Sequence, residues 1–237
     1  MYSYDATIRY SECDERRLLT LPALINLLQD CSTFHSEAIG HGVDYLAEHH
    51  FAWVITNWNI HILETPRFLD EVRVSTWCPE IGAVSARRNF TIDAPDRRLV
   101  EADSMWVVFD TDRGRAVRVP KEEMAFVSDD APLEMGRERR KIKPQGTGTD
   151  LDPIVVAKHH LDTNHHVNNG QYVAFAHDAV QVLDEGFLPS RLLVQYRTPA
   201  RLGDTVHRHA YREEGAWCVD LTDAEGTRYA ICRLVGA

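Results

Sequence analysis

The chain has 237 residues, of which 44% are hydrophobic and 26% are charged, a composition typical of a globular protein with a sizeable core. Its formal charge of −10 argues against binding to nucleic acid or to an anionic membrane. No apolar run is long enough to span a membrane, and the first residues lack a signal-peptide pattern, so we expect a cytoplasmic protein. The five cysteines include no CxxC spacing, which argues against a disulfide framework or a structural zinc site.

The first half of the chain begins with a short strand and one long helix. Thr20 is a suitable N-cap, and Pro22 is tolerated in the first turn. An apolar stripe at helical spacing follows, and Gly40 and Gly42 end the helix. The stripe consists of Leu24, Leu27, Leu28, Cys31 and Phe34.

Strands follow this helix. Alternating or β-branched segments predict strands over residues 54–62, 72–77, 86–92 and 101–110. Residues 129–150 are rich in Asp, Pro, Gly, Arg and Lys, and we interpret them as a linker.

The second half repeats the same order of elements. Asn168 or Asn169 can cap a second long helix, which Gly186 and Pro189 end. Strands are predicted over residues 192–197, 205–212, 217–222 and 228–235. The apolar stripe of this helix consists of Tyr172, Val173, Ala176, Ala179, Val180 and Leu183.

The connectors between strands repeat as well. Thr65-Pro66 precedes an Asp-x-Val strand in the first half, and Thr198-Pro199 precedes one in the second. A helix with a single apolar stripe must bury it against a sheet. We therefore predict an α+β fold of two tandem hotdog units, each a long helix wrapped by an antiparallel sheet, forming a pseudo-dimer with a continuous sheet. The expected boundaries are residues 1–128, a linker over 129–150, and residues 151–237.

The start of the second helix carries the candidate chemistry. Asp162, Asn164 and His166 alternate, so in an extended segment they would project to one side. They could orient or deprotonate a water molecule. The N–H groups of Val167, Asn168 and Asn169 at the helix N-terminus could stabilise an oxyanion.

A structural interpretation of the same residues is also open. Asp and Asn are ordinary residues before a helix, and a loop histidine is usually only solvated. Because the first half has DERRLL where the second has DTNHHV, the polar concentration at one helix start favours the catalytic interpretation.

The segment Asp162-x-Asn164-x-His166-Val167-Asn168-Asn169-x-x-Tyr172 resembles a motif of the plant and bacterial acyl-acyl-carrier-protein thioesterases. Further similarities follow in order along nearly the whole chain, at residues 26–30, 53–54, 66–72, 76–78, 87–88 and 105–108. The resemblance implies that Asp162, Asn164 and His166 are catalytic and that the first unit shapes the acyl pocket. It also implies hydrolysis of fatty acyl thioesters in fatty acid biosynthesis, without a cofactor.

The chain departs from the plant enzymes at one place. Those enzymes carry a Glu-Cys pair after a strand ending in Tyr-Arg, whereas here Tyr196-Arg197 leads to Thr198-Pro199-Ala200. This excludes a cysteine nucleophile at that site and favours direct attack by water. Asp162 is then the first candidate for the base, and His166 is the second.

The expected partner is acyl carrier protein, or alternatively acyl-CoA in the same chemistry. The sequence is compatible with either a monomer or a homodimer. Because both the chain and such a carrier are acidic, docking would need a local basic patch. The candidates are Arg87, Arg88, Arg137, Arg139, Arg140 and Lys141. The rival class is a non-catalytic acyl-binding or dehydratase-like hotdog protein. The paired histidines, His159-His160 and His165-His166, do not have a spacing suited to binding a metal ion.

Overall fold

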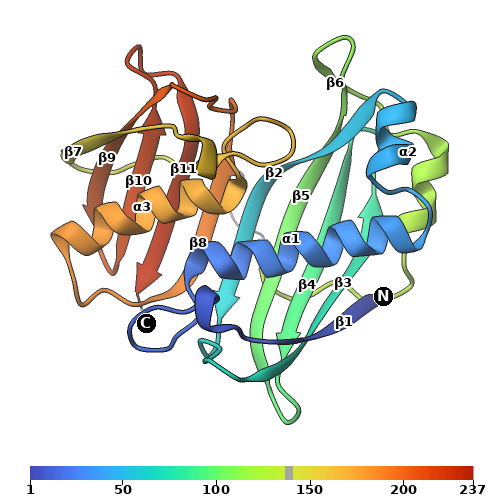
Figure 1. Ribbon diagram of the computed structural model, residues 1–237, viewed down its shortest axis with the longest axis horizontal. Helices are drawn as coiled ribbons and strands as arrows, with labels where there is room; N and C mark the ends of the chain where they lie inside the picture. The colour runs from blue at the N-terminus through green and yellow to red at the C-terminus, as the bar shows by residue number, and fades with distance from the viewer. Residues whose placement is uncertain (137–140, 237) are drawn as a thin grey trace. The chain divides into compact units, whose positions relative to one another are not determined.

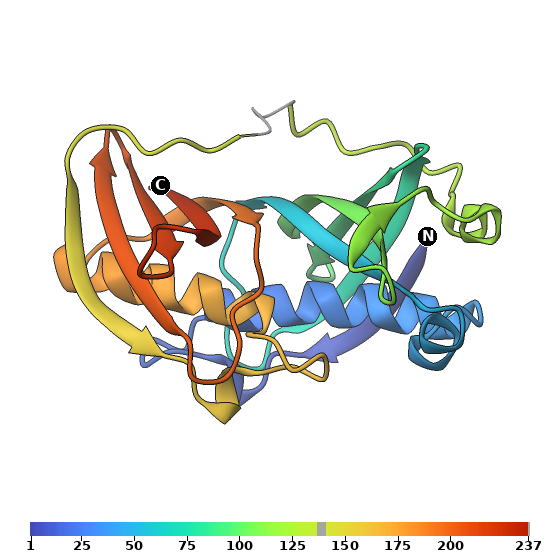
Figure 2. The same cartoon turned by 90° about the horizontal axis from the view of Figure 1, so that it is seen from above.

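The computed structural model describes residues 1–136 and 141–236. The chain divides into two compact units, Met1–Gly136 and Arg137–Ala237, called here the N-terminal and C-terminal units. In each, one long helix lies across one face of an antiparallel sheet (Figure 1). Figure 2 shows the strands of each unit curving around its helix.

The N-terminal unit consists of five main strands, two α-helices and two short 3-10 helices. Its sheet has the order β1-β3-β4-β5-β2, every pair is antiparallel, and β6 adds to β5. The elements are β1 (Tyr2–Thr7), η1 (Tyr10–Glu12), α1 (Leu21–Ala38), α2 (Val43–Glu48), β2 (Phe51–Ile62), β3 (Glu71–Ile81), β4 (Ser85–Asp93), β5 (Arg98–Asp110), β6 (Arg115–Val117) and η2 (Lys121–Phe126).

The C-terminal unit repeats this plan with one α-helix. Its sheet has the order β8-β11-β10-β9-β7, again with antiparallel pairs throughout. The elements are β7 (Gly148–Val155), η3 (Lys158–His160), α3 (Asn169–Leu183), β8 (Pro189–Tyr196), β9 (Thr205–Glu213), β10 (Ala216–Thr222) and β11 (Arg228–Gly236).

Both long helices form where the sequence predicts them. The Thr20 side chain accepts a hydrogen bond from the Ala23 N–H, and the Asn168 side chain accepts one from the Gly170 N–H, which satisfies a backbone donor at each helix start. The predicted stripes are buried against the sheets, except that Phe34 and Leu183 at their C-terminal ends are exposed. Burial of the stripes, at roughly 25 cal/mol per Å² of apolar surface, holds each helix on its sheet.

The predicted linker is only partly a connector. Its first residues bind the N-terminal sheet, because Trp77 Nε1 donates to the Ala131 carbonyl at 3.0 Å and Leu133 N donates to Asn89 Oδ1 at 3.0 Å. Its last three residues begin β7, which pairs with β9. Each unit therefore extends further into the linker than the sequence indicated.

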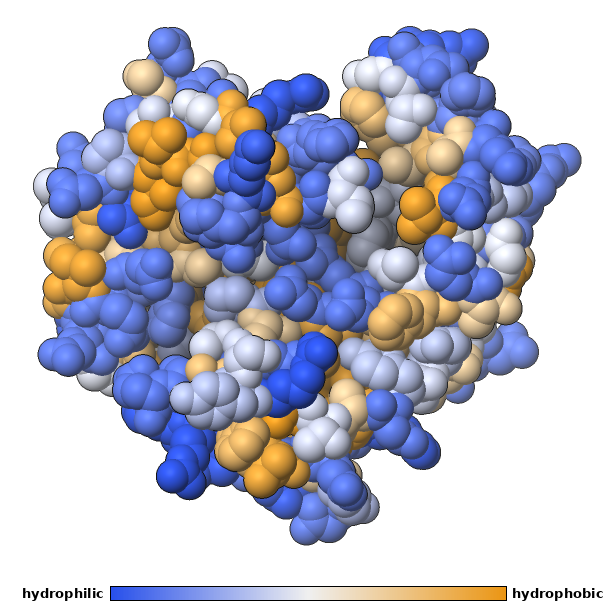
Figure 3. Space-filling model, viewed as in Figure 1, coloured by the Kyte–Doolittle hydropathy of each residue, from blue (hydrophilic) through white to orange (hydrophobic). Residues whose placement is uncertain are grey.

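The face drawn in Figure 3 is mostly hydrophilic, with apolar residues in separate patches. Isolated exposed apolar side chains are normal on a folded protein. No helix among residues 1–136 and 141–236 is long and apolar enough to cross a membrane.

Candidate active site

A tight turn precedes α3 in the C-terminal unit. We call residues 161–167 the Asp162 turn. Asp162 N donates to the His166 carbonyl at 2.8 Å, and His165 N donates to the Asp162 carbonyl at 3.1 Å. The Asp162 carboxylate accepts the Asn164 N–H at 2.8 Å, and His165 adopts a left-handed φ of 59°. The carboxylate thus holds the turn, as Asp side chains commonly do.

This geometry corrects the sequence interpretation of the segment. The prediction that Asp162, Asn164 and His166 alternate along an extended segment is wrong, because the chain turns back between residues 162 and 166. Asn164 is exposed at the tip of the turn, while Asp162 and His166 are half-buried at its base. Asp162 and His166 are therefore the pair that the turn brings together.

The N-terminal unit contains the same turn before α1, at residues 13–19, called here the Asp14 turn. Asp14 N donates to the Leu18 carbonyl and Arg17 N donates to the Asp14 carbonyl, both at 2.9 Å. The Asp14 carboxylate accepts the N–H groups of Arg16 and Leu18, again at 2.9 Å, and Arg17 has a φ of 64°. The backbone of the Asp162 turn is therefore a shared structural device, and only its side chains are specific to the C-terminal unit.

The helix N-terminus offers fewer oxyanion donors than the sequence suggested. Val167 N donates to the Ala200 carbonyl at 2.9 Å, and Asn168 N donates to the His160 carbonyl at 2.9 Å. The Asn168 side chain is occupied with the Gly170 N–H at 2.7 Å. The prediction that Val167 and Asn168 supply free N–H groups is therefore wrong, and Asn169 is the first residue of α3.

His166 has the electrostatic setting of a base. Burial lowers the pKa of His166, the charge of Asp162 opposes this shift, and the charges of Arg201 and His165 add to it. A histidine whose pKa lies below 6.5 is neutral at pH 7 and can accept a proton. The corresponding residue in the Asp14 turn is Leu18, which cannot.

Three residues that the sequence interpretation did not assign to the site position the start of α3. The Ala200 carbonyl accepts the Val167 N–H, and Ala200 N donates to Tyr172 Oη at 2.7 Å. Tyr196 Oη donates to the Asn169 carbonyl at 3.1 Å. The two tyrosines could have been suspected from sequence, since each carries a hydroxyl within an otherwise apolar pattern.

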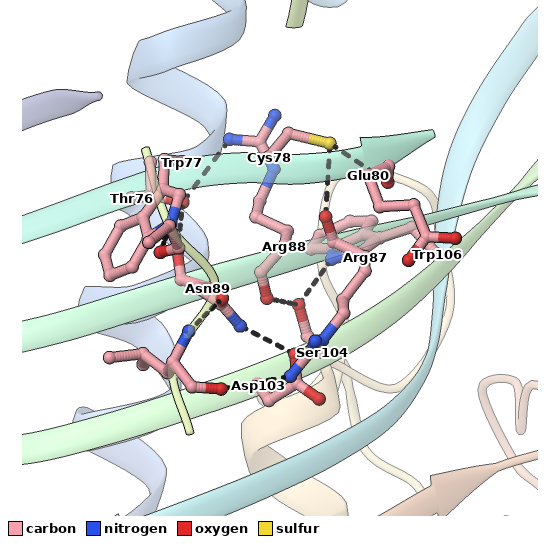
Figure 4. Close-up of polar contacts among 12 residues, drawn as sticks. Thr76, Trp77, Cys78, Glu80, Arg87, Arg88, Asn89, Asp103, Ser104 and Trp106 are labelled. Atoms are coloured by element: carbon pink, nitrogen blue, oxygen red, sulfur yellow. Dashed lines mark hydrogen bonds and ion pairs between the residues drawn. The ribbon is translucent and has the colours of Figure 1, made fainter. Parts of the chain in front are cut away.

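The basic residues proposed for carrier docking do not form one surface patch. Arg88 is only 7% exposed, so the prediction that it contacts a carrier at the surface is wrong. Arg87 is half-buried and its Nε donates to Asp103 Oδ1 at 2.6 Å (Figure 4). Lys141 is exposed. Three further candidates lie outside the described residues: Arg137, Arg139 and Arg140.

No group of three His, Cys, Asp or Glu side chains in the described part of the chain is arranged to hold a metal ion.

Comparison with known proteins gives matches in both units. Residues 1–127 match the family described as Acyl-ACP thioesterase N-terminal domain, and residues 148–232 match the Acyl-ACP thioesterase C-terminal domain. The chain is 26% identical over 200 residues to an oleoyl-acyl carrier protein thioesterase of Coriandrum sativum, covering 76% of this chain and 53% of that protein. It is 25% identical over 229 residues to oleoyl-acyl carrier protein thioesterase 2 of Arabidopsis thaliana, covering 86% of this chain and 61% of that protein. The chain thus spans between about half and three fifths of the length of these curated relatives.

Solved structures share the fold. An acyl-ACP thioesterase from Bacteroides thetaiotaomicron superposes with a TM-score of 0.89 at 20% identity, covering 99% of this chain and 97% of that chain. The 12:0-ACP thioesterase from Umbellularia californica gives a TM-score of 0.85 at 20% identity, covering 100% and 96%. These likenesses establish the double hotdog fold. Because the two family matches together span almost all of the chain, it belongs to the acyl-ACP thioesterase family.

Proposed function

We propose that the chain hydrolyses fatty acyl thioesters of acyl carrier protein, releasing a free fatty acid and the carrier thiol in fatty acid biosynthesis. Family membership and the names of the curated relatives support this activity. The observation that carries it is the difference between the two turns. Both have the same backbone hydrogen bonds, yet the C-terminal unit has His166 and Asn169 where the N-terminal unit has Leu18 and Leu21. Support of a turn does not require this exchange, whereas chemistry does.

The reaction needs polarisation of the thioester carbonyl. With the carbonyl at the start of α3, the partial positive charge of the helix N-terminus stabilises the oxyanion that forms when water attacks. Asn169 stands first in the helix, and Tyr196 fixes its peptide by donating to its carbonyl. The oxyanion then collapses, the C–S bond breaks, and the carrier leaves as its thiol after taking up a proton.

His166 is the base in this proposal, in place of Asp162, the first candidate from sequence. The imidazole takes a proton from the attacking water and returns it to the leaving thiolate. Asp162 stabilises the imidazolium, since its charge raises the pKa of His166. The carboxylate of Asp162 already accepts a backbone N–H, and Asp14 has the same role where no chemistry is proposed. Asp162 therefore shares its turn-holding role with Asp14, whereas its effect on His166 is specific to the C-terminal unit.

A covalent route through a cysteine has no support in the C-terminal unit. Its cysteines, Cys218 and Cys232, are fully buried in strands, and burial raises the pKa of both thiols. A thiol kept protonated in this way is a poor nucleophile.

Steady-state hydrolysis of decanoyl-carrier protein and decanoyl-CoA by the wild type, His166→Ala and Leu18→Ala tests the function. We expect wild-type turnover with a preference for the carrier thioester, a loss of roughly 10²–10⁴-fold in His166→Ala, and little change in Leu18→Ala. A preference for decanoyl-CoA would assign the same chemistry to the other carrier. Absence of turnover with both substrates would instead identify a non-catalytic acyl-binding protein.

A further inference from the structure

The N-terminal unit contains a buried arginine that the proposed reaction does not use. Arg88 lies on β4 and is 7% exposed, next to the half-buried Arg87. Figure 4 shows the two side chains leaving the strand on opposite sides, as the alternation of a β-strand requires. Arg87 reaches Asp103 and forms an ion pair at 2.6 Å. Arg88 extends past Cys78 on the other side (Figure 4).

The contacts of Arg88 are neutral. Its Nη1 lies 3.0 Å from Nδ1 of His35 on α1 and 3.4 Å from Oγ1 of Thr76 on β3. Its guanidinium carbon lies 4.9 Å from the centre of the Phe126 ring. Within residues 1–136 and 141–236, no carboxylate comes within ion-pair distance of it. The cation is therefore buried without a counterion.

His35 accepts a hydrogen bond from Arg88 and carries no second positive charge. Burial and the Arg88 charge lower the pKa of His35 to about 4, so the imidazole is neutral at pH 7. Because Arg88 can only donate, Nδ1 of His35 is the acceptor and the ring proton lies on Nε2. His35 thus offers a further N–H donor beside the guanidinium.

The carboxylate of Glu123 influences Arg88 electrostatically but is bound elsewhere. Glu123 is fully buried, and its Oε1 lies 2.8 Å from His41 Nδ1. Trp53 Nε1 donates to its Oε2 at 2.5 Å. Phe126 contacts both clusters, since its ring meets His35, His41 and Arg88. Both carboxylate oxygens of Glu123 are thereby engaged, and no hydrogen bond from the described residues occupies Nε or Nη2 of Arg88.

These unused donors indicate a specific kind of ligand. Burial of an uncompensated charge is unfavourable, so binding of an anion that neutralises Arg88 would be favourable. Two parallel N–H groups of a guanidinium match the two oxygens of a carboxylate. The surroundings, with Phe126 and the buried thiols Cys31 and Cys78, are apolar. An anion suited to this place therefore carries an apolar body.

We propose that Arg88 and His35 form a carboxylate-binding site inside the N-terminal unit that takes a carboxylate on an alkyl chain. The carboxylate belongs either to a free fatty acid or to the far end of an ω-carboxylated acyl thioester. Binding at this site does not depend on hydrolysis at the Asp162 turn, so the site can be tested separately from the proposed function.

Titration calorimetry with decanoate and 1-decanol tests the site, because the two differ in the carboxylate alone. We expect the wild type to bind decanoate at least about tenfold more tightly than decanol. Arg88→Gln should lose this preference and keep its affinity for decanol. Arg73→Gln, which removes an exposed arginine from the neighbouring strand β3, should behave as the wild type. Equal binding of both ligands by the wild type, or a preference kept by Arg88→Gln, would overturn the proposal.

A second measurement covers the case in which Arg88→Gln does not fold. In wild-type protein, the ¹³C signal of carboxyl-labelled decanoate should titrate with a pKa below that of free decanoate, since pairing with a guanidinium favours the ionised form. An unshifted or raised pKa of the bound ligand contradicts the site.

The two sources are separated by KM values for the decanoyl and the ω-carboxydecanoyl thioesters of N-acetylcysteamine. A lower KM for the ω-carboxylated substrate, abolished by Arg88→Gln, assigns the site to the far end of the acyl chain. Equal KM values together with tight decanoate binding assign it to a free fatty acid. If neither thioester is hydrolysed, the decanoate titration still decides the site, and the proposed function is judged on the carrier-protein thioester alone.

Discussion

Replacing Asp14 and Asp162 separately by alanine distinguishes support of a turn from catalysis. Asp14 accepts two backbone N–H groups, from Arg16 and Leu18, whereas the Asp162 carboxylate accepts one, from Asn164. A net contribution of about 1–1.5 kcal/mol for each partly exposed bond gives a loss of about 2–3 kcal/mol for Asp14→Ala and about 1–1.5 kcal/mol for Asp162→Ala. At roughly 2–4 °C per kcal/mol, Asp14→Ala should lower the Tm more.

The effect on activity should run in the opposite order. Asp162→Ala removes the charge that favours the His166 imidazolium, so kcat/KM should fall by roughly 10²–10³-fold. Asp14→Ala should stay within about twofold of the wild type, despite its larger loss of stability. Thermal unfolding and steady-state hydrolysis of an acyl-carrier-protein thioester measure the two effects. Equal rates in the two variants would refute the reasoning, since Asp162 would then only support its turn.

The pH dependence of stability provides a control for the Asp14 variant. Burial alone would raise the pKa of Asp14, but hydrogen bonds from Leu18 and Arg16 lower it overall. A depressed carboxyl pKa contributes stability above the unfolded value, and this contribution is lost as the pH falls through the folded value. The difference in Tm between wild type and Asp14→Ala should therefore be full at neutral pH and shrink below about pH 4.

Three further outcomes are expected. The acid limb of kcat/KM should have its midpoint below pH 6.5, and Asp162→Asn should move it lower still, because Asp162 raises the pKa of His166; a limb above 6.5 would exclude His166 as the base. Lys141→Glu should raise KM for the carrier substrate about threefold at low ionic strength. The increase should be smaller in 0.5 M salt, where the screening length is roughly 4 Å. An effect independent of salt would argue against carrier docking at Lys141. Glu123→Ala should destabilise the N-terminal unit by about 3 kcal/mol in urea unfolding, since His41 and Trp53 lose their buried partner; a change below about 1 kcal/mol would show that the cluster is dispensable.

The repeat was predictable because it depends on local patterns. The caps Thr20 and Asn168, the apolar stripes and the proline connectors are each written within a few residues, and the structure confirms the two long helices and the main strands. The short helix α2 and strand β6 were not predicted. Both are too short for hydrophobic periodicity to reveal.

The sequence contains a signal for the Asp162 turn that competes with the alternation of polar residues. The alternation of polar residues suggested an extended segment, but Asp followed two residues later by Asn also favours a turn closed by the Asp side chain. Asp14, which aligns with Asp162 in the repeat, also favours a structural role for Asp162, since a residue shared by both units is more readily explained by structure than by chemistry. The repeat therefore separates the backbone atoms that both units share from the side chains that are specific to the C-terminal unit.

Burial of Arg88 could not be obtained from the sequence alone. Two adjacent arginines on a strand must face opposite sides, so one of them had to point away from the other. Which side faces α1 depends on the register of β4 between β3 and β5, and this is a tertiary property. Composition favoured a surface patch for both, because unpaired arginines are rarely buried.

In the proposed mechanism, the segment Thr198-Pro199-Ala200 leaves the chemistry to the Asp162 turn. Ala200 holds the start of α3 through both its N–H and its carbonyl, to Tyr172 and Val167, and it offers no functional side chain. The backbone at this position therefore positions the helix, while any proton transfer must come from a neighbouring element. His166, the proposed base, is half-buried next to this backbone, and Arg201, the residue after Ala200, adds to the lowering of its pKa. A chain without the carboxylate and the thiol can thus keep the reaction if its histidine is already neutral when water attacks.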